Sequence, residues 1–349
     1  MSLAPFEFEG VSVRPGQRAV VEMPAAHLYT RTALSIPVHI VHGRRPGPVL
    51  LVCAAIHGDE LNGVEVIRRL LTLGGLKRMH GTLVAVPVVN VFGFIHKSRY
   101  LPDRRDLNRC FPGSETGSLG ARMAHLLKSR ILDRATHAID LHTGAIHRSN
   151  LPQIRANLDS PDTAAMARAF GVPVVINSVL REGTLREVAE AQNIPVITYE
   201  AGEALRFDET SIRVGVRGVV AVMRDLGMLT RRRQPEPMVQ PAVANSSSWV
   251  RAEDDGVFRP LVALGARVRP GQLLGRISSP FGTDERDVIA PYSGILIGRN
   301  NLPLVNEGDA LFHVARFDEV KDVAAQVEAF SQSIESEPPV AEDEAPILA

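Results

Sequence analysis

Short apolar runs alternate with segments of helical periodicity through the first two thirds of the chain, and this alternation limits the fold more than any other feature. The runs that have strand length are residues 49–56, 81–87, 138–141, 173–176 and 195–199. Between them apolar residues recur every three or four positions, as in the segment 61–73. This order predicts an α/β fold in which a mostly parallel or mixed sheet is flanked by helices.

Changes of composition along the chain predict its organisation. We expect an α/β domain over residues 1–233, with antiparallel edge strands in 1–40, followed by a proline- and serine-rich linker over 234–248. Short strands and glycine turns over 249–318 indicate a smaller all-β module. Residues 319–349 form an acidic tail that we expect to be disordered.

Composition excludes several classes of function. The 349 residues carry 39 basic and 39 acidic side chains, so no basic surface for nucleic acid is implied. No apolar run approaches the ~20 residues that span a membrane, and no signal peptide is recognisable at the N-terminus. The two cysteines, Cys53 and Cys110, do not make a disulfide framework. We expect a cytoplasmic protein with neither a nucleic-acid nor a membrane partner.

Two apolar runs end in residues that can bind a metal. His57 and Glu60 follow the run 49–56, and His142 follows the run 138–141. Two imidazoles and one carboxylate form the donor set of a catalytic zinc site, which keeps one position open for water. Asp140 could orient an imidazole through a hydrogen bond. The alternative is that these are polar residues at strand ends that bind nothing.

Further charged residues suit an anionic substrate. Asn108 and Arg109 lie together in a long loop, where a guanidinium and an amide can hold a carboxylate. Arg99 in the same loop could stabilise an oxyanion, and Glu200 at the end of an apolar run could act as a general base. The alternative for the arginines is an exposed position on a surface loop.

Four short motifs together resemble the succinylglutamate desuccinylase/aspartoacylase family, a branch of the zinc carboxypeptidase fold. They are His-Gly-Asp-Glu at 57–60, Asp-Leu-Asn-Arg-Cys-Phe-Pro-Gly at 106–113, Asp-Leu-His-Thr-Gly at 140–144 and Glu-Ala-Gly at 200–202. The resemblance extends over residues 35–315, including the all-β module. It implies a zinc carboxypeptidase-like fold.

The resemblance also implies roles for individual residues. His57, Glu60 and His142 would bind one Zn²⁺ per chain, and Glu200 would be the general base. By the same resemblance Asn108 and Arg109 would bind the α-carboxylate of the substrate, and Arg99 would polarise the acyl carbonyl and stabilise the oxyanion.

The activity that the resemblance implies is hydrolysis of a small N-acyl amino acid to a carboxylic acid and a free amino acid. N-acetylaspartate, succinylglutamate and acetyldiaminobutyrate all fit the motifs. The alternatives are a zinc carboxypeptidase acting on peptides and a non-catalytic zinc- or ligand-binding protein. A homo-oligomer is compatible with the sequence, which leaves the oligomeric state open.

The all-β module resembles the barrel-sandwich domains of lipoyl and biotinyl carriers. Those domains present a lysine at a hairpin tip, whereas the corresponding segment 283–294 contains none. A carrier role is therefore disfavoured. By the family resemblance, the module narrows access to the active site, which would favour small substrates over peptides.

Overall fold

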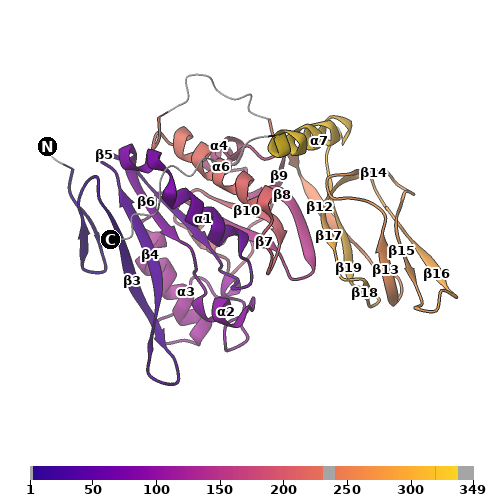
Figure 1. Cartoon of the computed structure of the whole chain (residues 1–349), viewed down its shortest axis with the longest axis horizontal. Helices are drawn as coiled ribbons and strands as arrows, with labels where there is room; N and C mark the ends of the chain where they lie inside the picture. Colours follow the sequence, from indigo (N-terminus) through magenta and orange to yellow (C-terminus); the bar gives the residue numbers. More distant parts are fainter. Residues whose placement is uncertain (1–2, 231–239, 319, 337–349) are drawn as a thin grey trace.

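A mixed β-sheet runs through the computed structural model, which describes residues 3–230, 240–318 and 320–336 (Figure 1). Across the sheet the strands are, in order, β12 (Ser246–Arg251), β19 (Ala310–Arg316), β17 (Gly294–Asn300), β8 (Arg148–Ala156), β10 (Val196–Glu203), β7 (His137–Gly144), β5 (Arg45–Ala54), β6 (His80–Val86), β4 (Ala33–His42) and β3 (Arg18–His27). The four strands β10, β7, β5 and β6 are parallel, and antiparallel strands extend the sheet on both sides. The predicted α/β fold with a mixed sheet is confirmed.

Helices cover both faces of the parallel part of the sheet. One face carries α1 (Asn62–Thr72), α4 (Pro161–Phe170), α6 (Glu209–Asp225) and the end of α7 (Val320–Ser336). The other face carries α2 (Val91–His96), α3 (Leu119–Arg130) and α5 (Leu185–Ala191). Short 3-10 helices occupy Gly74–Arg78, Leu107–Arg109 and Leu132–Arg134, and a separate hairpin joins β1 (Phe6–Phe8) to β2 (Val11–Val13).

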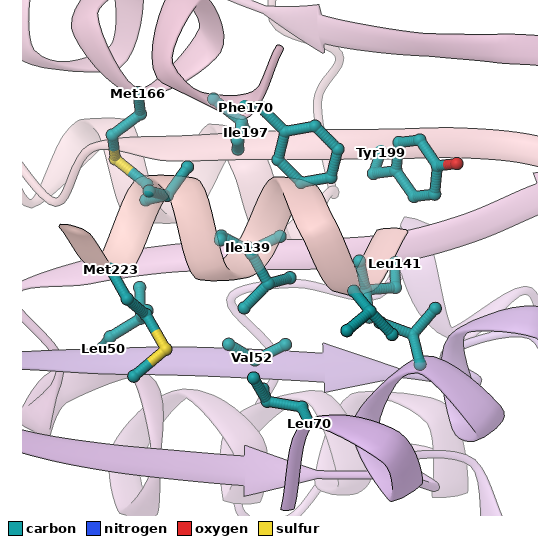
Figure 2. Packing of buried hydrophobic residues seen from close by; sticks show 14 of the residues in the cluster. Leu50, Val52, Leu70, Ile139, Leu141, Met166, Phe170, Ile197, Tyr199 and Met223 are labelled. Atoms are coloured by element: carbon teal, nitrogen blue, oxygen red, sulfur yellow. The ribbon is translucent and has the colours of Figure 1, made fainter. Parts of the chain in front are cut away.

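Strand β5 is buried on both faces, which explains why its sequence is apolar throughout. Leu50 and Val52 point to the face covered by α1 and α6, where Val52 lies near Leu70 (Figure 2). Leu51 and Cys53 point to the opposite face, which α3 and α5 cover. Successive side chains of a strand alternate between faces, so a strand that is buried on both sides cannot alternate apolar with polar residues. These buried central strands thereby determine where the carboxyl edge of the sheet lies.

The C-terminal strands form two antiparallel layers that enclose a core of their own. One layer is a separate sheet of β13 (Gly256–Pro260), β15 (Leu273–Ser278), β16 (Glu285–Ile289) and β18 (Leu304–Val305). The other layer consists of β12, β17 and β19 of the main sheet, with β14 (Arg267–Val268) paired to β17. Phe258 and Phe312 meet edge to face between the layers.

The C-terminal layers are continuous with the rest of the molecule. Strand β17 pairs with β8, and Gly298 lies opposite Asn150 in that ladder. The main sheet therefore passes from the parallel strands into the C-terminal strands without a break (Figure 1). In the described part of the chain, no helix is both long enough and apolar enough to cross a membrane.

Two expectations about irregular segments are wrong in part. In the predicted linker 234–248, residues 234–239 lie outside the described part, but β11 (Ala242–Ala244) adds to the sheet beside β9 (Val174–Asn177), and β12 begins at Ser246. Backbone hydrogen bonding to β9 and β19 overrides the local turn composition.

The predicted disorder of residues 319–349 does not hold for 320–336, which form helix α7. Its apolar side chains recur at helical spacing and are buried, namely Val323, Val327, Phe330 and Ile334. Burial of this apolar face stabilises a segment whose acidic composition alone suggested disorder. Residues 337–349 lie outside the described part.

Candidate metal centre and substrate cavity

Three adjacent parallel strands carry the predicted metal ligands and base. His57 lies three residues beyond β5, His142 lies in β7 and Glu200 lies in β10. His142 and Glu200 were expected just past strand ends, but both strands continue, to Gly144 and Glu203. The reason is that β10 pairs with β7 on one side and with β8 on the other, so its ladder extends through Glu200, which faces His142 across the strands.

His57, Glu60 and His142 come together in one buried cluster. Glu60 lies between the imidazoles, with Oε1 2.7 Å from His57 Nδ1 and Oε2 2.8 Å from His142 Nδ1. The three residues each offer one ligand atom, and these atoms lie within 4.8 Å of one another. Gly58 permits this turn, because a Cβ there would lie 2.0 Å from the backbone carbon of Gly93.

A second carboxylate orients each imidazole through the ring nitrogen that does not contact Glu60. His57 Nε2 lies 3.1 Å from Asp106 Oδ1, and His142 Nε2 lies 2.8 Å from Asp140 Oδ2. Metal-binding histidines commonly donate their other N–H to a carboxylate in this way. The sequence suggested such a role for Asp140 but not for Asp106, which comes from a distant loop.

The electrostatics of the cluster favour a cation. Burial raises the pKa of the Glu60 carboxyl, but the adjacent imidazoles of His57 and His142 outweigh burial and hold this pKa well below its usual range. Burial also opposes ionisation of Asp106, whose pKa is nevertheless lowered by His57 and Arg99. Carboxylates that stay ionised inside a protein need positive partners, and the two imidazoles are neutral when they bind a metal.

Arg99 lies beside this cluster and contacts two of its carboxylates. Its Nη1 donates to Glu60 Oε1 at 3.2 Å, and its Nη2 donates to Asp106 Oδ2 at 2.9 Å. The side chain is one quarter exposed, so its guanidinium is partly available to a ligand. The structure thus places Arg99 next to the predicted metal ligands rather than on a solvated loop surface.

Glu200 is held by two side chains of the neighbouring strand β8. Asn150 Nδ2 donates to Glu200 Oε2 at 2.6 Å, and Arg155 Nε lies 3.0 Å from Glu200 Oε1. Sequence reasoning missed both partners. No local motif marks them, because they reach Glu200 only through the antiparallel pairing of β8 with β10.

Asn108 and Arg109 form a short 3-10 helix that packs against the start of α5. Asn108 Oδ1 accepts a hydrogen bond from the backbone N–H of Leu185 at 2.9 Å, which leaves its amide N–H groups to donate elsewhere. The carbonyl of Gly183 accepts from the N–H of Phe111 and ties the two segments together. Asn108 is therefore fixed in orientation, while the Arg109 side chain is exposed.

Most of these groups line one cavity of about 500 Å³. All seven predicted site residues line it, namely His57, Glu60, Arg99, Asn108, Arg109, His142 and Glu200. The C-terminal strands contribute Trp249 and His313, whose rings stack with centroids 4.7 Å apart and planes 9° apart. Sequence reasoning missed these two residues as well.

The sequence and the fold correspond to a known class of proteins. Residues 46–226, more than half of the chain, match the model of the succinylglutamate desuccinylase/aspartoacylase catalytic domain. The chain belongs to this family, and the resemblance seen in the sequence is confirmed.

Individual relatives span most of the chain. It is 26% identical over 323 residues to the N-alpha-acetyl-L-2,4-diaminobutyric acid deacetylase of Halomonas elongata, covering 89% of this chain and 93% of that protein. The product-bound ectoine utilization protein EutE (DoeB) of Ruegeria pomeroyi superposes with a TM-score of 0.76 at 25% identity, over 86% of this chain and 94% of the other.

A crystal structure of a succinylglutamate desuccinylase/aspartoacylase from Rhodobacter sphaeroides is similar to the same extent. Its TM-score is 0.76 at 26% identity, with 86% of this chain and 96% of that chain covered. Each of these three alignments covers at least 86% of this chain, which is more than the 226 residues up to the end of the matched catalytic domain. The likeness is therefore not confined to that domain.

Proposed function

We propose that this protein is a zinc-dependent amidohydrolase that cleaves the amide bond of a small N-acyl amino acid. One observation carries the proposal. A buried carboxylate, Glu60, lies between two imidazoles that are each backed by a further carboxylate, and this cluster faces the same cavity as Glu200. The names of the relatives from Halomonas elongata and Rhodobacter sphaeroides support the same class of reaction.

The cluster fits a zinc ion by the chemistry of its donors. Two imidazole nitrogens and one carboxylate oxygen are the ligands that a catalytic zinc site uses, and Asp106 and Asp140 supply the hydrogen bonds that orient such imidazoles. His57, Glu60 and His142 would hold the ion. Zinc bound there would supply a Lewis acid that polarises the acyl carbonyl and lowers the pKa of water towards ~7.

The protein's own residues would then carry the proton transfers. Glu200 accepts a proton from the attacking water, whose oxygen bonds to the acyl carbon. When the carbon–nitrogen bond breaks, Glu200 returns this proton to the leaving amine, so the products are a carboxylate and a free amino acid. Asn150 and Arg155 fix the Glu200 carboxylate from the side of β8.

The remaining predicted residues would position the substrate. Asn108 and Arg109 bind the α-carboxylate, because one offers fixed amide donors and the other an exposed guanidinium. Arg99 stabilises the negative charge that develops on the acyl oxygen. Holding the substrate at both ends converts binding energy into orientation of the reacting amide. A cavity of about 500 Å³ suits a small molecule.

The test is release of free amine from a panel of N-acyl amino acids, with a chelator and with zinc added back. We expect one or more members to be hydrolysed, with activity lost to the chelator and restored by zinc. A peptide panel run in parallel measures release of C-terminal residues. Hydrolysis that is confined to peptides, or insensitive to chelation, would contradict the proposal.

A further inference from the structure

The cavity contains more positive charge than hydrolysis of a simple N-acyl amino acid needs. Six arginines line it, namely Arg99, Arg109, Arg148, Arg155, Arg181 and Arg186. Arg99 and Arg155 pair with carboxylates of the site. Within the described residues, no carboxylate lies within ion-pair distance of the other four. Unpaired guanidinium groups that share a confined cavity repel one another unless an anion enters.

The four arginines without an ion pair fall into two groups at different parts of the cavity wall. Arg186 donates to the Ser178 hydroxyl and the Val179 carbonyl, and Arg109 donates to the Asn108 carbonyl, so these bonds leave their positive charges uncompensated. Arg109, Arg181 and Arg186 come from the two segments that Asn108 and Gly183 tie together. Partial burial of its guanidinium lowers the pKa of Arg109, and the nearby Arg181 and Arg99 lower it further against the opposing charge of Asp106. This group surrounds the position proposed for the α-carboxylate. Arg148 instead begins β8, next to the C-terminal strands.

Arg148 is held by a stack of rings from the C-terminal strands. Its guanidinium carbon lies 5.4 Å from the centroid of the Trp249 ring, over the ring face. His313 stacks on the same indole, and its Nε2 lies 2.9 Å from the Ser247 hydroxyl. Stacking on an aromatic face fixes a guanidinium plane while its N–H edge stays available to an anion.

Two further features suit this stack to an anion. Burial lowers the pKa of His313 to about 3, helped by the charge of Arg155, so the ring is neutral and does not repel Arg148. His313 is 6% exposed, and its Nδ1 has no hydrogen-bond partner in the described structure. A buried polar atom without a partner, next to a ligand cavity, marks a place that a ligand or a water must satisfy.

The sheet itself makes room for this stack. Trp249, His313, Gly298 and Asn150 lie opposite one another on the successive strands β12, β19, β17 and β8. A Cβ on Gly298 would lie 3.0 Å from His313 Cβ, 3.1 Å from Asn150 Oδ1 and 3.5 Å from Trp249 Cη2. Glycine at 298 therefore lets the Trp249 ring lean across the sheet towards Asn150 and the cavity.

A second amine on the substrate would find no free carboxylate among the described residues that line the cavity. In the described part of the chain, the carboxylates that line the cavity are Glu60, Asp140 and Glu200. Glu60 contacts both imidazoles, Asp140 contacts His142, and Glu200 contacts Asn150 and Arg155. All three already have partners, so an ammonium group would meet no carboxylate without one and would be repelled by the arginines.

We propose that Arg148, held on the Trp249–His313 stack, binds a second carboxylate of the substrate. The protein would then act on N-acyl amino acids that carry a carboxylate besides the α-carboxylate, and would discriminate against those with an additional amine. The inference rests on the proposed hydrolase function. The second carboxylate can belong to the amino-acid side chain or to a dicarboxylic acyl group.

The test compares kcat/KM of the zinc-loaded protein for four substrates. N-acetylglutamate and N-succinylalanine carry the second carboxylate at opposite ends, N-acetylalanine lacks it, and N-acetyldiaminobutyrate carries an amine instead. We expect one of the two dicarboxylates to exceed N-acetylalanine by about 10- to 100-fold, the effect of a hydrogen bond to a charged group. The one preferred shows which end occupies the stack.

Arg148→Gln should lower that preference about 10-fold or more, mainly through KM. Arg122→Gln, on the exposed surface of α3 and away from the cavity, is the matched control. Preference for the diaminobutyrate substrate, absence of preference, or an equal loss on all four substrates in Arg148→Gln would overturn the inference while leaving the hydrolase function in place.

Binding separates the inference from the proposed function. Calorimetry with the zinc-loaded Glu200→Gln variant and N-acetylglutamate or N-succinylalanine needs no turnover. Binding that weakens when Arg148→Gln is added supports the subsite, even if no member of the panel is hydrolysed, and only the hydrolase proposal then fails. Dicarboxylate binding that is unaffected by Arg148→Gln, or no binding of either dicarboxylate, would overturn the inference.

Discussion

The metal cluster and the Trp249–His313 stack line one cavity, but the chain builds them in different ways. The cluster lies at the carboxyl edge of parallel strands, where His57 and Glu60 are close in sequence and His142 lies on the next strand. The stack comes from β12 and β19, which reach the cavity only because β17 pairs with β8. Local strand–turn geometry thus provides the chemistry, whereas extension of the sheet provides the wall that faces the substrate.

Removal of a predicted metal ligand should have the largest effect. His57→Ala leaves two of the three donors and removes one of the partners of Asp106, so we expect bound zinc to be lost and turnover to fall to background. Metal content by mass spectrometry, beside activity, measures both. Unchanged zinc stoichiometry would contradict the ligand assignment.

Loss of the base should separate chemistry from metal binding. Glu200→Gln keeps the shape of the side chain and its neighbours but cannot accept a proton, so we expect turnover to fall roughly 10²- to 10⁴-fold. Zinc content should stay at the wild-type level, because Glu200 is not part of the three-residue cluster. Near-normal turnover in this variant would remove Glu200 from its proposed role.

We expect an intermediate effect from Asp140, which contacts a predicted metal ligand but is not itself one. Asp140→Asn keeps a hydrogen-bonding group beside His142 Nε2 but removes the charge, so zinc affinity should fall about 10- to 100-fold. Competition with a chromogenic chelator measures the affinity. Asp159→Asn, at an exposed position, is the control, and equal affinities in the two variants would show that Asp140 has no orienting role.

Among the C-terminal strands, the most informative single substitution is Gly298→Ala. The added methyl group would press on His313 and Asn150, and we expect a loss of about 1–3 kcal/mol in the free energy of unfolding, the cost of overpacking. A weaker preference for the dicarboxylate substrate should accompany it. Gly75→Ala is the control, since a Cβ there approaches only Leu229 Cδ2 at 4.0 Å. Wild-type stability and selectivity in Gly298→Ala would show that the stack tolerates displacement.

The smallest effect concerns acid stability. The pKa of His313 is lowered from 6.5 to about 3 in the folded protein, so the unfolded chain binds a proton first as the pH falls. The contribution of neutral His313 is therefore complete above pH ~6.5 and is lost progressively towards the folded pKa. Between pH 6.5 and 5.5 this costs about 1 kcal/mol.

Urea denaturation at those two pH values measures the difference in the free energy of unfolding. In His313→Gln we expect a loss about 1 kcal/mol smaller than in the wild-type protein over the same interval. Equal pH dependence of the two proteins would show that His313 is not held neutral by burial.

Much of the fold follows from the sequence because burial on both faces leaves a simple signature. Strand β5 is apolar at successive positions from Val49 to Ala54, and the helices around it repeat apolar residues every three or four positions. The acidic composition of the C-terminal segment gave the wrong prediction for α7. There the four buried apolar side chains decide the structure, although they are a minority of its residues.

The part of the candidate site that could be predicted consists of residues that lie close to strand ends and within short motifs. Neither feature identifies four other residues of the cavity, namely Asn150, Arg155, Trp249 and His313. Each lies within a strand, and each becomes part of the cavity only when β8, β12 and β19 take their places in the sheet. Pairing register is set by contacts between distant segments, which a local pattern does not contain.

The sequence by itself determined the α/β class, the apolar strands that deliver His57, His142 and Glu200 to one edge, and the family to which the chain belongs. Only the tertiary structure decided which groups hold these residues and which residues face the far side of the cavity. The physical reason is that periodicity and motifs report the environment of a residue along its own segment. Hydrogen bonds such as Asn150 to Glu200, and stacking such as Trp249 on His313, depend on which strands become neighbours.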